Sequence, residues 1–217
     1  MSLKSSLRTL VTLGQGVVQG IPEAAADRDP ISLFQEWFKA AEESGIFLPE
    51  AVALATATAQ GAPSVRMVLL KGVDPRGFVF YTNYESRKAV ELEANPQASL
   101  CFHWAVLERQ VRIEGLVERV AHEESQAYFS SRPRGSRIGA WASHQSAALT
   151  SREVLEERVR RFEKEYPGEE VPLPPFWGGY LLRPARIEFW QGKADRLHER
   201  LEFVRDGQAW TTRRLYP

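Results

Sequence analysis

Residues 51–83 read AVALATATAQGAPSVRMVLLKGVDPRGFVFYTN, and this stretch decides the fold class. Apolar residues recur there with a period of two, which predicts strands over Val52–Ala59, Ser64–Val73 and Phe78–Thr82. Gln60–Pro63 and Asp74–Gly77 separate these strands and contain the Pro and Gly residues that tight turns favour. Short strands joined by such turns indicate an antiparallel sheet.

Further strands and several helices are expected around this stretch. The strands are predicted at Ala98–Leu107, Gln110–Val120, Arg186–Gln191, Leu201–Arg205 and Ala209–Arg213. One helix is predicted to start at Asp29 and Pro30 and to end at Gly45. A second starts with Ser86 as its N-cap and ends near Ala94. The remaining helices are predicted at Glu123–Ser131, Ile138–Ser143 and Ser151–Tyr166. This mixture predicts an α+β fold, mainly β and barrel-like. Residues 1–28 are expected to form a mobile N-terminal arm and 29–217 a single domain.

Composition excludes several kinds of protein. The 28 Lys and Arg residues balance the 28 Asp and Glu residues, which argues against a nucleic-acid binder and against a polybasic membrane-surface protein. A single cysteine, Cys101, excludes an intrachain disulfide and a cysteine-based zinc site, and the spacing of the four histidines suggests no metal. The lone thiol and the interrupted apolar run near the N-terminus favour a cytoplasmic protein.

The zero net charge conceals two stretches without any acidic residue, 51–73 and 125–152. The first contains Arg66 and Lys71, and we expect it to lie near Ser86, Arg87 and Lys88 at a helix N-terminus, where backbone N–H groups favour a phosphate. The second contains the basic segment Ser130–Arg137. Each cluster alone is also compatible with a solvated basic surface. Together they favour two phosphates, one on a cofactor and one on a substrate.

A third segment of interest is Arg196–Arg200. If it is a strand, Arg196, His198 and Arg200 lie on one face of it. Trp190, a few residues earlier, either stacks on a flat ligand ring or packs into the core.

These segments, in this order, resemble the pyridoxamine 5'-phosphate oxidase family over about residues 29–217. The matching stretches are Arg66–Lys71, Tyr81–Lys88, Gln110–Arg112, Tyr128–Pro133, Ser143–Ser146, Pro174–Gly179, Ile187–Gly192, Arg196–Arg200 and Arg214–Pro217. The resemblance implies an FMN-binding split β-barrel with flanking helices that acts as a homodimer, with FMN at the subunit interface.

The resemblance also implies roles for individual residues. The positions that correspond to FMN contacts are Arg66, Met67, Val68, Leu69, Leu70, Lys71, Tyr81, Thr82, Ser86, Arg87, Lys88, Gln110, Gln145, Ser146, Trp190 and Arg200. Those that correspond to substrate-phosphate contacts are Lys71, Tyr128, Arg132 and Ser136. Arg196 and His198 correspond to catalytic residues over the pyridine ring of the substrate.

The implied reaction oxidises pyridoxine or pyridoxamine 5'-phosphate to pyridoxal 5'-phosphate, with oxygen as electron acceptor and hydrogen peroxide as the second product. The alternatives are a related split-barrel flavin oxidase of phenazine type and a non-catalytic flavin- or heme-binding split-barrel protein. This sequence departs from the family pattern in its N-terminal arm, where residues 9–27 contain neither Arg nor Tyr, and at Glu199, where Asp is common.

Overall fold

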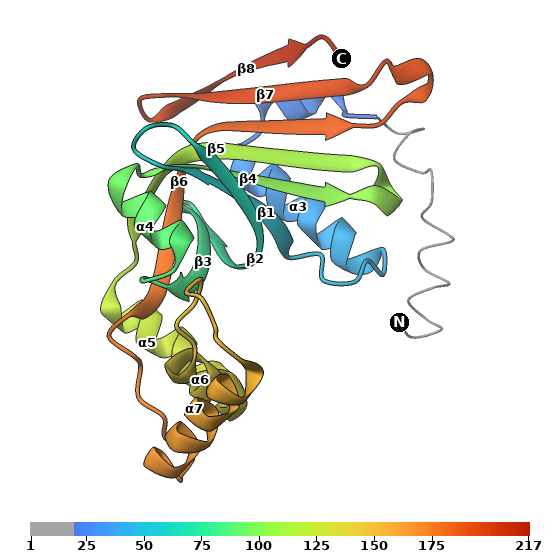
Figure 1. Ribbon diagram of the computed structural model, residues 1–217. Coiled ribbons are helices and arrows are strands. Elements are labelled where there is room, and N and C mark those ends of the chain that lie inside the picture. Colours follow the sequence, from blue (N-terminus) through green and yellow to red (C-terminus); the bar gives the residue numbers. More distant parts are fainter. Residues whose placement is uncertain (1–19) are drawn as a thin grey trace.

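The computed structural model describes residues 20–217, and its centre is an antiparallel barrel (Figure 1). The strands of this part of the chain form one sheet in the order β3-β2-β1-β4-β5-β6-β7-β8, and β3 also pairs with β6, so the first six strands close on themselves. Closure pairs both edges of the barrel sheet. The strands are β1 Ala51–Ala57, β2 Pro63–Asp74, β3 Gly77–Asn83, β4 Gln97–Trp104, β5 Arg109–Arg119, β6 Trp177–Gln191, β7 Glu199–Asp206 and β8 Ala209–Leu215.

Helix α3, Pro30–Glu43, packs its apolar face against the barrel. It begins as expected, because the Asp29 carboxylate accepts a hydrogen bond from the Ser32 backbone N–H at 2.8 Å and Pro30 is its first residue. Phe34 is fully buried, with its ring centroid 4.9 Å from that of Phe78 and 5.1 Å from that of Phe102. These rings form the centre of the main core.

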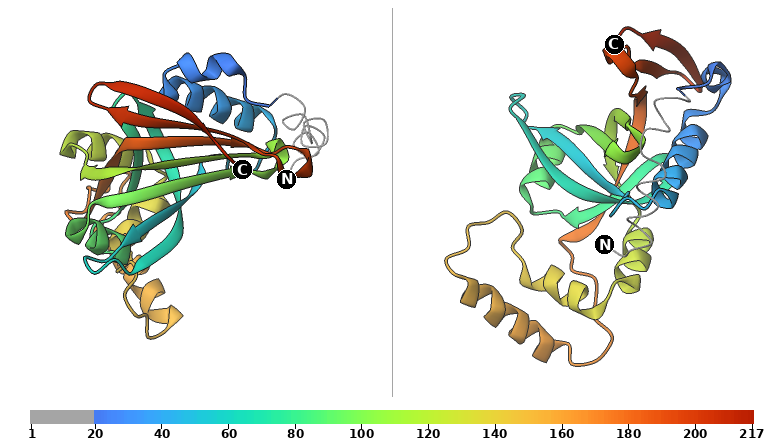
Figure 2. Two further views of the ribbon diagram at one scale, coloured as in Figure 1. Left: turned by 90° about the horizontal axis from the view of Figure 1, so that it is seen from above. Right: turned by 90° about the vertical axis from the view of Figure 1, so that its right-hand side faces the viewer.

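Three further helices form a lobe at one end of the barrel, whereas the β7–β8 hairpin lies at the other end (Figures 1 and 2). The helices are α5 His122–Ser131, α6 Arg134–Ala142 and α7 Arg152–Glu165, and the shorter α4, Arg87–Ala94, lies beside the barrel. The lobe has its own apolar cluster, which includes Phe129, Ile138, Phe162 and Trp177. Strand β6 begins in this cluster at Trp177 and crosses the whole barrel.

Several expected boundaries differ from the structure. Strand β6 starts nine residues before the expected Arg186, because Trp177–Ala185 pairs with β3 and β5 although two glycines and Pro184 obscure its pattern. The strand expected at Ala98–Leu107 ends at Trp104, and a 3-10 turn covers Ala105–Leu107. Helix α6 starts at Arg134, four residues before the expected Ile138.

The N-terminal arm is described only from residue 20. Within it, η1, Glu23–Asp27, lies against β8, and Ile21 and Ala25 are buried in the main core. The Ile21 backbone N–H donates to the Glu199 carboxylate at 2.5 Å. Among the helices of residues 20–217, none is long and apolar enough to cross a membrane.

Candidate active site

The turn between β3 and α4 forms the first part of the site. The Asn83 side chain accepts a hydrogen bond from the Glu85 backbone N–H at 2.6 Å, and the Ser86 hydroxyl donates to the Asn83 carbonyl at 2.7 Å. Ser86 therefore occupies the expected N-cap position of α4, but its side chain does not cap the helix. The first turn of α4 is thus available to an anion, which its backbone N–H groups and dipole favour.

Lys88, in the first turn of α4, is buried with only 9% of its surface exposed. Its ammonium group donates to the Gln145 side-chain oxygen at 2.7 Å and to the hydroxyls of Thr82 and Ser86 at 3.2 Å each. Within residues 20–217, no carboxylate forms an ion pair with it. Burial, and then repulsion from Arg66, lower the pKa of Lys88 to about 8. A buried cation held only by neutral oxygens is suited to receive an anion.

Two arginines of the same cluster meet at Glu91, a buried carboxylate on α4. Arg87 Nε donates to it at 2.8 Å and Arg66 Nη2 at 3.2 Å, and the hydroxyls of Thr56 and Ser64 also donate to it. Burial raises the pKa of the Glu91 carboxyl, but these hydroxyls and Arg87 outweigh that effect and hold it at about 2. Glu91 is therefore charged at neutral pH and holds both guanidinium groups in place.

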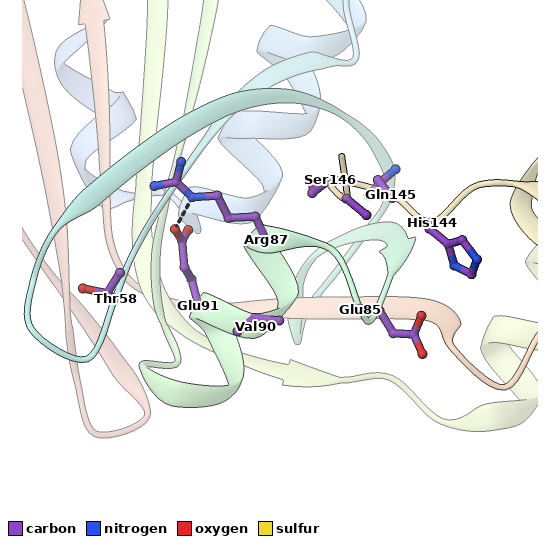
Figure 3. A pocket seen from close by; sticks show the side chains of 9 residues that line it. Thr58, Glu85, Arg87, Val90, Glu91, His144, Gln145 and Ser146 are labelled. Atoms are coloured by element: carbon purple, nitrogen blue, oxygen red, sulfur yellow. Dashed lines mark hydrogen bonds and ion pairs between the residues drawn. The ribbon is translucent and has the colours of Figure 1, made fainter. Parts of the chain in front are cut away.

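A cavity of about 620 Å³ opens beside these arginines (Figure 3). Its lining residues are Thr58, Glu85, Arg87, Val90, Glu91, His144, Gln145, Ser146 and Ala147. Figure 3 shows Arg87 and Glu91 on α4, with His144, Gln145 and Ser146 reaching the cavity from a separate loop. Because Gln145 accepts from both Lys88 and Thr82, it connects this loop to α4 and β3. The structure thus brings together the predicted residues Arg87, Gln145 and Ser146.

A second cavity, of about 300 Å³, lies in the helical lobe. It is lined by Asn83, Arg132, Ser136, Gly139, Ala140, Ser143, Gln145 and Trp177. The Arg132 guanidinium lies 4.7 Å from the Trp177 ring centroid, and its Nη1 is buried without a hydrogen-bond partner in the described part of the chain. Leaving a buried donor unpaired costs about 1–3 kcal/mol. An anion in this cavity, next to Arg132 and Ser136, would remove that cost.

Trp177, which lines this second cavity, belongs to a stack of three aromatic rings. The Tyr81 ring centroid lies 3.9 Å from that of Tyr128 and 5.6 Å from that of Trp177, with all three rings nearly parallel. Burial raises the pKa of Tyr81 to about 12, so its hydroxyl keeps its proton at neutral pH. A Cβ on Gly179 would lie 2.7 Å from the Tyr81 ring, so glycine is needed for this stack. Tyr81 and Tyr128 are predicted site residues, whereas Trp177 has no predicted role. Its signal in the sequence is an aromatic residue directly before two glycines.

Lys71 lies at an irregularity of β2, where the register with β3 shifts between Leu70 and Gly72. Its ammonium group is 3.7 Å from the Glu50 carboxylate, and it lines a third cavity of about 380 Å³ rather than the Arg132 cavity. Burial raises the pKa of Tyr128, Arg132 lowers it and the negative charge of Glu50 raises it, so Glu50 lies within electrostatic reach of the aromatic stack.

The other predicted residues of β2 divide between its two faces. Leu70 is buried and Val68 packs against the core, whereas Met67 and Leu69 point outward, 62% and 38% exposed. The outward side chains form part of an apolar row on the outer face of the barrel.

Another group of predicted residues lies on the outer face of the sheet. Gln110 pairs with Trp190 across β5 and β6, and Trp190 pairs with Arg200 across β6 and β7, so the three form one cross-strand row. The Trp190 ring lies 4.6 Å from the His198 ring.

The expectation that Arg196, His198 and Arg200 share a strand face is wrong. β7 begins at Glu199, and Arg196 ends a 3-10 turn in which Asp195 and Arg196 have φ values of 56° and 60°. The segment reverses the chain between β6 and β7, and such a reversal is incompatible with extended alternation. His198 nevertheless comes close to the row through its contact with Trp190.

The two groups of predicted residues lie at opposite ends of β6. Trp177 is the first residue of β6 and pairs with Asn83, and both line the Arg132 cavity. Trp190 is the penultimate residue of this 15-residue strand. Thirteen residues of extended strand span about 40 Å along the chain. Figure 1 shows the corresponding separation between the α5–α7 lobe and the β7–β8 hairpin. One copy of the chain therefore does not bring all predicted residues to one place.

The closed barrel with its helical lobe places the chain among the split-barrel proteins. A solved structure of an FMN-binding protein from Nostoc punctiforme, related to pyridoxamine 5'-phosphate oxidase, has the same fold, with a TM-score of 0.70 and 18% identity over 88% of this chain and 99% of its own. The protein PhzG from Burkholderia lata, solved with tetrahydrophenazine-1-carboxylic acid, gives a TM-score of 0.86 and 34% identity over 92% of this chain and 98% of its own.

Comparisons of sequence define the family. The model of the family described as pyridoxamine 5'-phosphate oxidase matches residues 38–165, and that of the pyridoxine 5'-phosphate oxidase C-terminal dimerisation region matches residues 177–217. The chain is 57% identical to the pyridoxine/pyridoxamine 5'-phosphate oxidase of Psychromonas ingrahamii over the full length of both, and 57% identical to that of Rubrobacter xylanophilus over 91% of each. The chain therefore belongs to the pyridoxamine 5'-phosphate oxidase family.

Proposed function

We propose that this protein is a cytoplasmic FMN-dependent oxidase that converts pyridoxamine or pyridoxine 5'-phosphate to pyridoxal 5'-phosphate. Oxygen is the electron acceptor and hydrogen peroxide is released. Two separate cationic sites carry the proposal, and neither has an anionic partner among residues 20–217. They are the buried Lys88, which pairs with no carboxylate there, and the buried Arg132 Nη1, which has no acceptor there.

The residues around Lys88 fit the phosphate of FMN. Lys88, Arg66 and Arg87 supply three positive charges, and Glu91 compensates only one of them. The uncapped first turn of α4 adds backbone N–H donors. These groups bind and orient the cofactor, and FMN supplies the two-electron oxidation chemistry when it is bound.

The Arg132 cavity fits the phosphate of the substrate. Arg132 offers its Nη1, which has no hydrogen-bond partner among residues 20–217, and Ser136 and Trp177 line the same cavity. The rings of Tyr81 and Tyr128 stack with that of Trp177. The pairing of a guanidinium with a phosphate is strong because the hydrogen bonds are charge-assisted. A phosphate held there anchors the substrate and limits the freedom of its ring.

The separation of the two groups along β6 supports a homodimer with FMN at the interface. Gln110, Trp190 and Arg200 lie too far along the strand from Lys88 to meet the same cofactor within one chain. In a symmetric dimer, the row of one copy faces the Lys88 site of the other. The apolar residues Val65 and Met67, 69% and 62% exposed on the outer face, become covered in such an assembly.

His198 and Arg196 are the proposed catalytic residues. His198 Nδ1 accepts a hydrogen bond from the Lys193 backbone N–H at 3.2 Å, which fixes the ring and leaves Nε2 as the atom that holds or moves a proton. Arg196, in the same tight turn, supplies a positive charge that orients the substrate. Both lie on the loop between β6 and β7, and the His198 ring lies 4.6 Å from the Trp190 ring.

The similarity to PhzG makes a phenazine-type oxidase the second candidate. The buried Arg132 site favours a phosphorylated substrate, because a substrate without phosphate leaves Arg132 Nη1 unpaired. The test is to purify the protein, record its flavin absorbance, and add pyridoxine 5'-phosphate with oxygen, with unphosphorylated pyridoxine as the matched control substrate. Formation of pyridoxal 5'-phosphate from the phosphorylated substrate, without formation of pyridoxal from pyridoxine, supports the proposal. Bound flavin without turnover of pyridoxine 5'-phosphate or of pyridoxamine 5'-phosphate refutes it.

A further inference from the structure

Glu188 is a carboxylate on the outer face of the barrel that is nevertheless only 3% exposed. It lies in β6 and pairs with Arg112 on β5 and with Glu202 on β7. Burial raises the pKa of the Glu188 carboxyl, but hydrogen bonds from Arg200 and Arg112 outweigh this effect and keep its pKa below the usual value. Glu188 is therefore a buried anion, and within residues 20–217 its ion pairs are those with these two arginines.

Arg200 is held by Glu188 through two parallel hydrogen bonds. Its Nε donates to Glu188 Oε1 at 2.8 Å and its Nη2 donates to Oε2 at 3.1 Å. Its Nη1 donates to the Tyr216 carbonyl at 2.8 Å. The orientation of the guanidinium plane beside Trp190 is thus fixed from two sides before any ligand binds.

Arg112 completes the cluster from the other side of Glu188. Its Nη2 also donates to Glu188 Oε2, whereas its Nε is buried without a hydrogen-bond partner among the described residues. Both carboxylate oxygens of Glu188 are therefore used by arginines. A buried ion pair contributes little to stability, because desolvation offsets the attraction, so stability alone is a weak reason for this arrangement.

We propose that Glu188 is a positioning residue for cofactor binding, which holds Arg200 in the orientation in which Arg200 contacts FMN. This inference rests on the proposed function, in which Arg200 of one copy faces the cofactor. An arginine side chain has about 2 kcal/mol of rotamer entropy to lose. Glu188 removes that freedom in the free protein, so the cofactor does not have to order the side chain when it binds.

Glu202 provides a matched control within the same sheet. It lies directly opposite Glu188, is 2% exposed, and is also paired with two arginines, Arg186 and Arg213. Replacing either carboxylate with Gln removes one buried negative charge at almost the same place. Glu202 acts on Arg200 through its charge alone, whereas the change at Glu188 also removes a hydrogen bond that holds Arg200.

The experiment measures the dissociation constant of FMN by fluorescence titration of the flavin-free protein. Glu188→Gln is expected to raise this constant about tenfold, because it removes one charge-assisted hydrogen bond from Arg200. Glu202→Gln should leave the constant unchanged. Glu188→Asp, which keeps the charge but shortens the side chain, is the second variant should Glu188→Gln fail to fold. In an Arg200→Ala background, neither Glu188 change should weaken binding further.

The outcomes separate this inference from the proposed function. No FMN binding by the unchanged protein refutes the proposed function itself. Normal binding by the unchanged protein together with an equal effect of Glu188→Gln and Glu202→Gln overturns the positioning role. The same holds if the Glu188 changes weaken binding equally with and without Arg200, or if Arg200→Ala leaves the affinity intact. Thermal unfolding and light scattering of each variant show whether fold and assembly are retained.

Discussion

Raising the pH from 7 to 9 is expected to weaken the binding of FMN about tenfold, because Lys88 loses its proton within this range in the free protein. Burial and the neighbouring Arg66 lower the pKa of Lys88 from 10.5 to about 8. A phosphate next to the ammonium group favours the charged form and raises the pKa again. Above pH 8, the binding of FMN is therefore coupled to protonation of Lys88, and the affinity for FMN falls as the pH rises.

The expected factor follows from the pKa of Lys88 in the free protein. If FMN binds only the protonated form, the apparent dissociation constant rises by a factor of about 1.1 at pH 7 and about 11 at pH 9, relative to full protonation. The ratio is about tenfold, equivalent to about 1.4 kcal/mol. Lys88→Met removes the titrating group, so this variant should bind FMN more weakly at pH 7 and show no further loss up to pH 9.

The same group changes the stability of the flavin-free protein in the opposite direction. Below pH 8, Lys88 is charged in both the folded and unfolded states, and the shift from 10.5 to about 8 costs the folded state about 3 kcal/mol. Between about pH 8 and 10.5 the unfolded chain binds the extra proton, so the free energy of unfolding rises with pH. In Lys88→Met, this rise should disappear.

Flavin fluorescence titration between pH 7 and 9 and urea unfolding of the flavin-free protein measure both effects. The matched control is Lys39→Met, because Lys39 is an exposed lysine on α3 with a 73% exposed side chain. This variant should keep the pH dependence of the unchanged protein. An affinity that stays constant from pH 7 to 9, or a slope that survives in Lys88→Met, would refute the assignment of Lys88 to the phosphate site.

Arg132→Ala should raise the KM for pyridoxine 5'-phosphate by about tenfold to a hundredfold, because it removes a charge-assisted phosphate contact; steady-state kinetics test this, and an unchanged KM excludes Arg132 from the site. Arg196→Ala should lower turnover far more than FMN affinity, as judged by kcat beside a flavin titration, and an equal loss of both contradicts its catalytic role. Gly179→Ala should lower the free energy of unfolding by about 1–3 kcal/mol, because its Cβ would meet the Tyr81 ring at 2.7 Å. Gly135→Ala, with no neighbouring atom within 4 Å, is the control in thermal unfolding, and similar losses in both variants would contradict this packing argument.

Local patterns in the sequence determined most of the secondary structure. The predicted strands match β1, β2 and β3 to within two residues at each end. β1 and most of β2 alternate because one face of each is buried, whereas β3 is buried on both faces and is marked by its flanking turns. Asp29 and Pro30 marked the start of α3 for a similarly local reason, since the cap bonds within its own turn. Strand β6 was only partly predicted, because Gly178, Gly179 and Pro184 weaken its pattern and its pairing with β3 is long-range.

The basic clusters were likewise visible in the sequence, as stretches without acidic residues. What the sequence did not reveal was which of their members lack a partner. Glu91 neutralises Arg66 and Arg87 in part, and Glu50 does the same for Lys71. Glu91 is four residues from Arg87 on the same helix, but its pairing with Arg66 and that of Glu50 with Lys71 join segments that are distant in sequence. Lys88 remains without a carboxylate among residues 20–217 only because of how α4 packs on the barrel.

The sequence by itself determined the strands, the helix starts and the two stretches of positive charge, because each depends on residues close together in the chain. Tertiary structure alone decided which residues share a site. The register of β6 with β3, β5 and β7 places Trp177 beside Asn83 and Trp190 beside Arg200, at opposite ends of one strand. Cross-strand register depends on pairings between distant segments, and a shift of one residue turns every side chain to the other face. No local pattern specifies such pairings.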